Sequence, residues 1–251
     1  MLVWAEKHLQ RTQDSIVEFM RQDTHTLITQ YDSEARQQVV SIRIKPLVEP
    51  EEWPFLIGDA LHDMRVAIEY LAFRVIMKKV PGADETKVAF PICSKPTNYG
   101  SLEGMRIGSN APDDVKKAFK SLQPCFRTNS PSTDPLFLLD ALENEHKHRR
   151  LLDAGFQLGG ISFGVLHDPR GSLNIKIVQM NAGPFQNGDE VARYDLMSAP
   201  DPELQAEFRA PAHIAFDKEG PARGAIVLQL LDGIRDHIRK VVFPTLEPFL
   251  K

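Results

Sequence analysis

The chain has little cysteine, and its two cysteines form no recognisable motif. Cys93 and Cys125 stand far apart in the sequence and outside any Cys-x-x-Cys pattern. Two thiols are too few for a disulfide framework, and free thiols suit a reducing compartment. The sequence therefore predicts a cytoplasmic protein that does not depend on disulfides.

Long apolar runs and an excess of positive charge are also lacking. No apolar stretch approaches the roughly 20 residues that a membrane-spanning helix needs, and charged residues interrupt the N-terminal segment too early for a signal peptide. The formal net charge is −4 and the pI is near 6.1, which excludes a generally basic surface for nucleic acid. We therefore expect no membrane partner, whereas a local basic patch is compatible with these values.

Common signatures of cofactor and metal chemistry are missing as well. The chain contains no Gly-x-Ser-x-Gly, no P-loop and no Gly-x-Gly-x-x-Gly sequence. His146 and His148 resemble a metal-binding pair, but residues two apart on a helix point to different faces, and no further ligands follow at a suitable spacing. We predict neither a cofactor nor a metal ion.

The residues that are present predict an α+β fold. Of the 251 residues, 42% are hydrophobic and 25% are charged, which are ordinary values for a protein with a sizeable core. Helical periodicity predicts an N-terminal helix over residues 2–22 and further helices over 52–79, 134–152 and 222–243. Alternating polarity predicts a hairpin within residues 25–44 and strands over 155–166, 172–180, 191–197 and 204–216.

Helices and strands are segregated along the sequence, which favours a helical core packed with a mostly antiparallel sheet over a doubly wound fold. No linker is long enough to divide the chain convincingly. We therefore expect a single α+β domain over residues 1–251.

The helix expected over residues 52–79 carries four polar side chains three or four residues apart: Asp59, His62, Arg65 and Glu69. This spacing stacks them along one strip, where Arg65 can pair with Glu69, and Tyr70 flanks the strip. The strip is either part of a binding site or the solvated face of an amphipathic helix.

A second polar segment, Asn144 to Arg149, ends the helix expected over residues 134–152. Three leucines define the inner seam of this helix: Leu138, Leu139 and Leu142. Continuing the seam at helical spacing turns His146 and Arg149 inward, while Lys147 and His148 point elsewhere.

A guanidinium in the core costs several kcal/mol unless a carboxylate or a ligand pairs with it. Asp59, Glu69 and Glu145 could pair with Arg149 in this way. We therefore predict that the two polar segments meet in space. Two alternatives stay open: an ion pair that only ties two core helices together, and a helix that ends near Glu145, to which the projection would not apply.

Four elements of the sequence resemble a family of uncharacterised bacterial proteins. In that family the stretch corresponding to residues 57–72 typically reads Gly-Asp-x-Leu-His-Asn-Leu-Arg-x-Ala-Leu-Asp-His-Leu. Phe-Pro-Ile at 90–92, Leu-Gln-Pro at 122–124 and a segment similar to Asn-x-Asp-Lys-His-Arg at 144–149 follow in the same order. The resemblance covers roughly residues 1–152 and brings no assigned activity with it.

The family motif is in turn similar to the Arg-x(4–6)-His motif of HEPN domains, which often act as metal-independent ribonucleases across a dimer interface. There the His acts as acid or base and the Arg stabilises the charge on the phosphorane. In this chain Tyr70 stands where the family has His. Tyrosine, with a pKa of about 10, is a poor base at neutral pH.

The resemblance implies Arg65, His62 and His148 as candidate catalytic residues. The candidate binding residues are Asp59, Glu69, Tyr70, Asn144, His146 and Arg149. The resulting hypothesis is a HEPN-like protein that binds RNA or a nucleotide with weak or no ribonuclease activity, and a homodimer is a candidate assembly. A non-catalytic structural or interaction protein and a small-molecule-binding protein are the alternatives.

Overall fold

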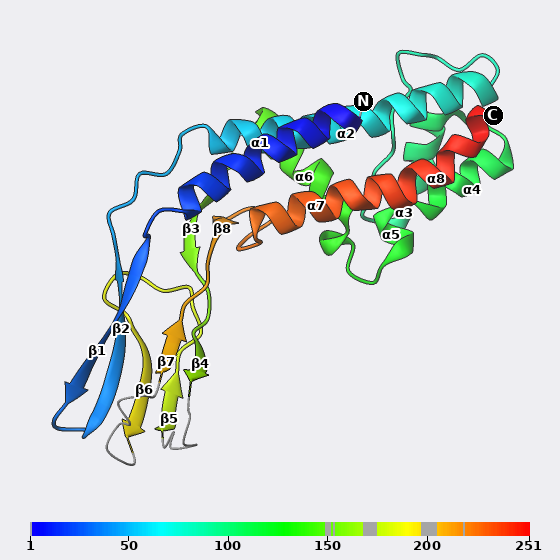
Figure 1. Ribbon diagram of the computed structural model, residues 1–251. Coiled ribbons are helices and arrows are strands. Elements are labelled where there is room, and N and C mark those ends of the chain that lie inside the picture. The colour runs from blue at the N-terminus through cyan, green and yellow to red at the C-terminus, as the bar shows by residue number, and fades with distance from the viewer. Residues whose placement is uncertain (1, 149–151, 153, 168–174, 197–204, 218) are drawn as a thin grey trace. The chain divides into compact units, whose positions relative to one another are not determined.

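The computed structural model describes residues 2–148, 152, 154–167, 175–196, 205–217 and 219–251 (Figure 1). The chain divides into two compact units. The helical unit comprises Met1–Ser15, Glu51–Ala154 and Ala215–Lys251, and the strand unit comprises Ile16–Pro50 and Gly155–Ile214. The prediction of one domain concerns both units together and stays a prediction.

The helical unit is built around one long helix, α2 (Trp53–Lys79). Pro54 lies in its first turn, where a missing N–H costs nothing. The remaining elements are α1 (Leu2–Met20, to Ser15 in this unit), α3 (Pro96–Glu103), η1 (Gly104–Gly108), α4 (Asp113–Ser121), α5 (Pro124–Arg127), η2 (Pro131–Thr133), α6 (Pro135–His148), α7 (Val227–His237), η3 (Ile238–Val242), α8 (Phe243–Leu246) and η4 (Glu247–Leu250). The core of the unit includes the fully buried Trp53, Ile57, Met64, Ile68 and Phe119.

The C-terminal helix differs from its prediction at both ends. A turn over residues 221–224, in which Gly224 has φ 69°, delays its start to Val227. The π-helical turn η3 then precedes Pro244, which lacks an N–H and would clash in a regular helix. The helical path therefore continues past residue 243 instead of ending there.

The strand unit contains a four-stranded sheet in the order β1-β2-β6-β5. Its strands are β1 (His25–Asp32), β2 (Gln37–Ile44), β5 (Ile175–Met180) and β6 (Glu190–Leu196), and neighbouring strands are antiparallel. Two further pairs are β3 (Ala154–Leu158) with β8 (Ala212–Phe216), and β4 (Ser162–His167) with the antiparallel β7 (Gln205–Arg209). The core of this unit is formed by Val40, Ile42, Leu158, Phe185, Val191, Ala192 and Ala210.

The α+β class and the mostly antiparallel sheet are therefore confirmed (Figure 1). Two predicted strands are each split. Gly159 and Gly160 separate β3 from β4, and Pro211, which has no N–H for a strand ladder, separates β7 from β8. Within the described residues, no helix combines the length and the hydropathy needed to cross a bilayer.

Candidate functional site

The candidate site lies where α2 and α6 pack together in the helical unit. Asp134 starts α6 as predicted, because its Oδ1 accepts a hydrogen bond of 2.9 Å from the backbone N–H of Leu136. Pro135 follows at the first position of the helix. From this start, α6 carries polar side chains that face those of α2. We call this set the polar seam: His62, Arg65 and Glu69 of α2 with Asp140, Glu143 and Lys147 of α6.

Arg65 is the centre of the polar seam. Its Nη2 lies 2.6 Å from Oε1 of Glu69 and donates a hydrogen bond of 3.2 Å to the carbonyl oxygen of Phe90. Its Nη1 lies 3.2 Å from Oδ1 of Asp140 on α6, at ion-pair distance but without hydrogen-bond geometry. Glu69 also accepts a 2.5 Å hydrogen bond from the N–H of Phe90. The predicted Arg65–Glu69 pair is present, and it is part of a larger network.

Asp140 sits in an environment that disfavours its charge. Burial raises its pKa above the ordinary value, Arg65 opposes this effect, and the neighbouring Glu143 adds to it. The guanidinium of Arg65, whose side chain is 16% exposed, is thus surrounded by two carboxylates and a carbonyl oxygen.

Glu143 forms the second part of the seam, one turn further along α6. Its Oε1 lies 3.2 Å from Nδ1 of His62 on α2, and Lys147 binds the same oxygen. Burial alone would raise the pKa of Glu143, but hydrogen bonds from Lys147 and His62 outweigh it and lower the pKa. The carboxylate is 7% exposed, whereas His62 and Lys147 are 49% and 39% exposed. The imidazole and the ammonium are therefore the groups that solvent reaches.

His146 meets α2 through packing alone. A Cβ atom placed on Gly58 would lie 2.2 Å from Nε2 of His146, so the imidazole occupies the space that a larger residue at 58 would fill. The Nδ1 atom of this ring is buried without a hydrogen-bond partner. The strip on α2 is met instead by Asp140 and Glu143, which precede the second polar segment. The predicted hydrogen bond or ion pair to His148 or Arg149 concerns side chains outside the described residues and stays a prediction.

The other candidate residues are less engaged. Asp59 is 60% exposed and lies 3.8 Å from His8. Tyr70 is 50% exposed, and Asn144 is exposed. The side chain of His148 and all of Arg149 lie outside the described residues. The structure thus brings together His62, Arg65 and Glu69, while Asp59, Tyr70 and Asn144 remain on the surface.

Asp140 and Glu143 were not among the predicted site residues. Lys147 is exposed, as expected for a residue that points away from the leucine seam, and it pairs with Glu143 on its own helix. The buried row of α6 is Leu136, Leu139 and Leu142 with Glu143, whereas Leu138 is only half-buried. Asp140, Glu143 and Lys147 repeat at the spacing of a helical strip. This spacing was the available signal, because it places Asp140 beside Arg65 and Glu143 beside His62.

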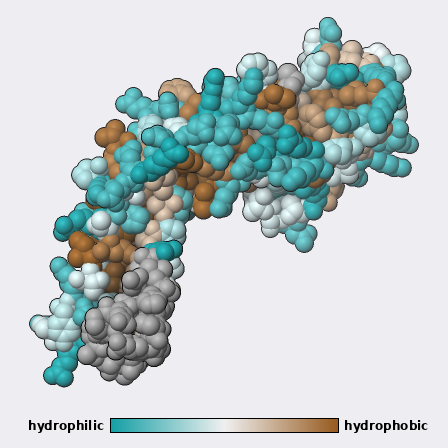
Figure 2. Space-filling view, viewed as in Figure 1, coloured by the Kyte–Doolittle hydropathy of each residue, from teal (hydrophilic) through white to brown (hydrophobic). Residues whose placement is uncertain are grey.

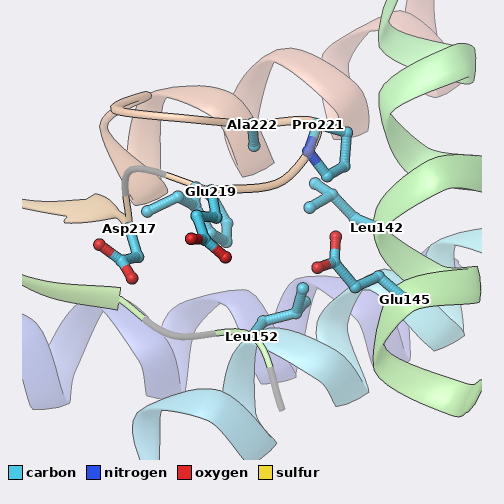
Figure 3. Close-up of a pocket in the computed structure, with 8 residues that line it drawn as sticks. Leu142, Glu145, Leu152, Asp217, Glu219, Pro221 and Ala222 are labelled. Carbon is cyan, nitrogen blue, oxygen red and sulfur yellow. The ribbon is translucent and has the colours of Figure 1, made fainter. Parts of the chain in front are cut away.

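A small cavity lies between this region of α6 and the loop that precedes α7. Figure 3 shows Leu142 and Glu145 on the helix facing Pro221 and Ala222 on the loop that precedes α7. The cavity measures about 10 Å³, which is space for a single water molecule at most. It offers no room for a substrate.

The other end of α6 carries a second cluster of a carboxylate, a cation and an imidazole. Asp134 is 1% exposed on its side chain, and Nη2 of Arg127 lies 3.6 Å from it. Nη1 of Arg127 donates to the ring of His237 on α7. Burial, together with the charge of Arg127, lowers the pKa of His237 to about 4. The ring is therefore neutral at physiological pH and accepts the hydrogen bond.

The described charges of the α2–α6 seam do not favour an anion. Two cations, Arg65 and Lys147, face three carboxylates, Glu69, Asp140 and Glu143. The part of the chain that the structure describes holds no group of three or more His, Cys, Asp or Glu residues suited to a metal ion. Comparison with protein-family models, curated proteins and solved structures found no match to this chain.

Proposed function

We propose that the polar seam between α2 and α6 is a structural ion-pair network, and that the chain is a non-catalytic protein whose function is to bind a macromolecular partner. The observation that carries the proposal is the pairing of Arg65 with two carboxylates of the protein itself. A phosphodiester transition state needs positive charge beside it, but the guanidinium of Arg65 already faces Glu69, Asp140 and the carbonyl of Phe90.

Two further features support the same proposal. Tyr70 occupies the position at which the similar family motif has His, and its side chain is half-exposed rather than turned into the seam. Large apolar side chains are also exposed on the helical unit, among them Trp4, Phe55 and Met105. Figure 2 shows apolar surface lying among the hydrophilic side chains of this unit. Contiguous exposed apolar surface is a mark of interaction sites, and the exposed apolar residues that recur along α2 are the ones that bear on this proposal.

Binding of RNA or a nucleotide is the second candidate, and one observation favours it. His62 and Lys147 are both partly open to solvent, and both are held by the buried carboxylate of Glu143. An imidazole oriented by a carboxylate is the arrangement that general acid–base catalysis uses. Under this second candidate, the residues that resemble the HEPN motif form a ribonuclease site whose activity is weakened but not lost.

Incubation of the purified chain with labelled single-stranded RNA at low salt, with and without EDTA, separates the two functions. We expect neither cleavage nor binding that depends on His62. His62→Ala is the informative variant, because a half-exposed side chain can be removed without loss of the fold. Lys117→Ala, an exposed lysine on α4, controls for the general loss of a positive charge.

EDTA-resistant cleavage that disappears in His62→Ala and persists in Lys117→Ala would contradict the non-catalytic proposal. RNA binding that weakens in His62→Ala alone would instead establish the second candidate. Binding that weakens equally in both variants would reflect unspecific charge, because phosphate contacts respond to any nearby cation.

A further inference from the structure

The outward side of α2 carries a largely apolar stripe that the helical unit leaves partly open to solvent. Seven residues recur three or four apart on this side: Phe55, Asp59, His62, Val66, Tyr70, Phe73 and Met77. They lie opposite the buried row that contains Ile57, Met64 and Ile68. We call these seven residues the outward stripe of α2.

Five of the seven residues in the outward stripe are aromatic or aliphatic. Phe55, Tyr70 and Met77 are 53%, 50% and 41% exposed, and Val66 and Phe73 are half-buried. A helix that packs one face against a core normally presents charged residues on the other face. An apolar stripe along a helix of 27 residues, about 40 Å long, therefore indicates that a second surface covers it.

The charges beside the stripe differ between its two halves. The N-terminal half of α2 and the residues before it expose Glu51, Glu52 and Asp59, whereas the C-terminal half exposes Arg74 and Lys78. The helix macrodipole favours this distribution of charge, but it gives no reason for the apolar residues between the charges.

An antiparallel copy of the same helix is complementary to this pattern. With Val66 opposite Val66, Phe55 of one copy faces Met77 of the other, and His62 faces Tyr70. Asp59 of one copy then lies within one residue of the position opposite Arg74 of the other copy. The two-fold axis repeats this contact at the other end of the interface. A parallel copy would instead bring acidic residues against acidic residues.

We propose that two copies of this chain associate through the outward stripe of α2, antiparallel and related by a two-fold axis. Such an interface is isologous, because the same patch serves on both sides. Its apolar centre provides the buried area, and the Asp59–Arg74 contacts fix the direction. The inference rests on the proposed function as a binding protein and names its partner as a second copy.

Reversal of single charges in the full chain tests this interface. Asp59→Arg and Arg74→Asp each place like charges at both ends of the two-fold interface. Like charges in an interface cost several kcal/mol, so we expect each variant to dissociate at least about a hundredfold more readily. Light scattering after size-exclusion chromatography over a range of concentrations measures this change.

Recombination of the two variants provides the decisive control. An equimolar mixture of Asp59→Arg and Arg74→Asp should form a heterodimer, because each reversed charge then meets an opposite one. The double variant in a single chain should form homodimers again. Lys117→Asp makes the same change of charge as Arg74→Asp on α4, away from the stripe, and should leave association unchanged.

A wild-type chain that stays monomeric at all concentrations would overturn the inference. A dimer that neither single variant weakens would also overturn it, because another surface would then hold the copies together. Neither result bears on whether the chain cleaves RNA, which the RNA experiment decides separately. Circular dichroism of each variant verifies that the exposed substitutions leave the fold intact.

Discussion

The two ends of α6 combine the same three kinds of group, a carboxylate, a cation and an imidazole, and differ in how far the imidazole and the cation are exposed. At the N-terminal end, the buried Asp134 is joined to Arg127, which in turn holds the buried His237. At the C-terminal end, the buried Glu143 holds Lys147 and His62, and both of these partners are partly open to solvent. A carboxylate, a cation and an imidazole therefore make a closed structural cluster in one case and an open one in the other.

The comparison teaches that residue types alone do not separate a site from a structural element. The closed end also caps the helix, since Asp134 accepts the N–H of Leu136, and the helix dipole favours its charge there. Glu143 has no such role, and only its side-chain partners offset its burial. Accessibility of the imidazole is the physical difference that decides which end could bind a ligand.

Removal of Arg65, which lies between the two ends, should have the largest effect. Arg65→Ala leaves Glu69, Asp140 and the carbonyl of Phe90 without their shared cation. We expect the free energy of unfolding to fall by about 3 kcal/mol. Urea denaturation measures this change, and Arg11→Ala on α1, an exposed arginine, should cost less than about 0.5 kcal/mol.

A double-mutant cycle sharpens this prediction. If Asp140 is a partner of Arg65, then Asp140→Asn combined with Arg65→Ala should cost less than the sum of the two single changes. Strict additivity would show that the ion pair does not stabilise the helix pair, and the structural proposal would then lose its support.

Protonation of His237 at the closed end should lower the free energy of unfolding of the chain by up to about 3 kcal/mol as the pH falls. His237 has its pKa lowered from 6.5 to about 4 in the folded chain, so the unfolded chain binds its proton first. The cost is therefore absent above about pH 6.5, grows as the pH falls, and is complete below about pH 4. The difference in unfolding free energy between the wild type and His237→Gln, measured across this window, isolates the contribution. Parallel profiles for the two proteins would contradict the closed arrangement.

Gly58→Ala should destabilise the open end by about 1–2 kcal/mol, although alanine has the higher helix propensity. The new methyl group would overlap the ring of His146. In a His146→Ala background the same change should become neutral or stabilising. Gly233→Ala on α7, where nothing lies within 4 Å of a new Cβ, should stabilise by roughly 0.5–1 kcal/mol. A destabilising Gly58→Ala in both backgrounds would refute the close packing.

Removal of the imidazole at the open end should have the smallest effect. His62→Ala breaks one contact of Glu143, but Lys147 remains bound to the same carboxylate. Because the imidazole is half-exposed, we expect a loss below about 1 kcal/mol. A loss comparable to that of Arg65→Ala would mean that the open end is as structural as the closed one.

Much of the fold could be predicted because the signals are local. The helix expected over 52–79 is α2, and the capping role of Asp134 follows from the Asp-Pro start of α6. The pair of Arg65 and Glu69 follows from their spacing along one helix. Each of these features depends on residues within a few positions of one another.

The missed part of the site depends on partners that are distant in sequence. In the sequence, Leu139 and Leu142 could share the buried side of α6 either with Leu138 or with Leu136. Only the packing of the folded unit shows that Leu136 is the buried one. The row that contains Leu136 brings Glu143 to α2. The outcome for Arg149 stays a prediction, because that residue lies outside the described part of the chain.

The discontinuity of the helical unit has a consequence for its synthesis. This unit is assembled from three separate stretches of chain, and α7 belongs to the last of them, Ala215–Lys251. During translation, α2 and α6 emerge long before α7 can supply His237, and the second segment of the strand unit, Gly155–Ile214, is made in the interval. Nascent chains therefore carry unfinished apolar faces for many seconds at a typical elongation rate of about 5–20 residues per second, and this interval is when chaperones would be needed most.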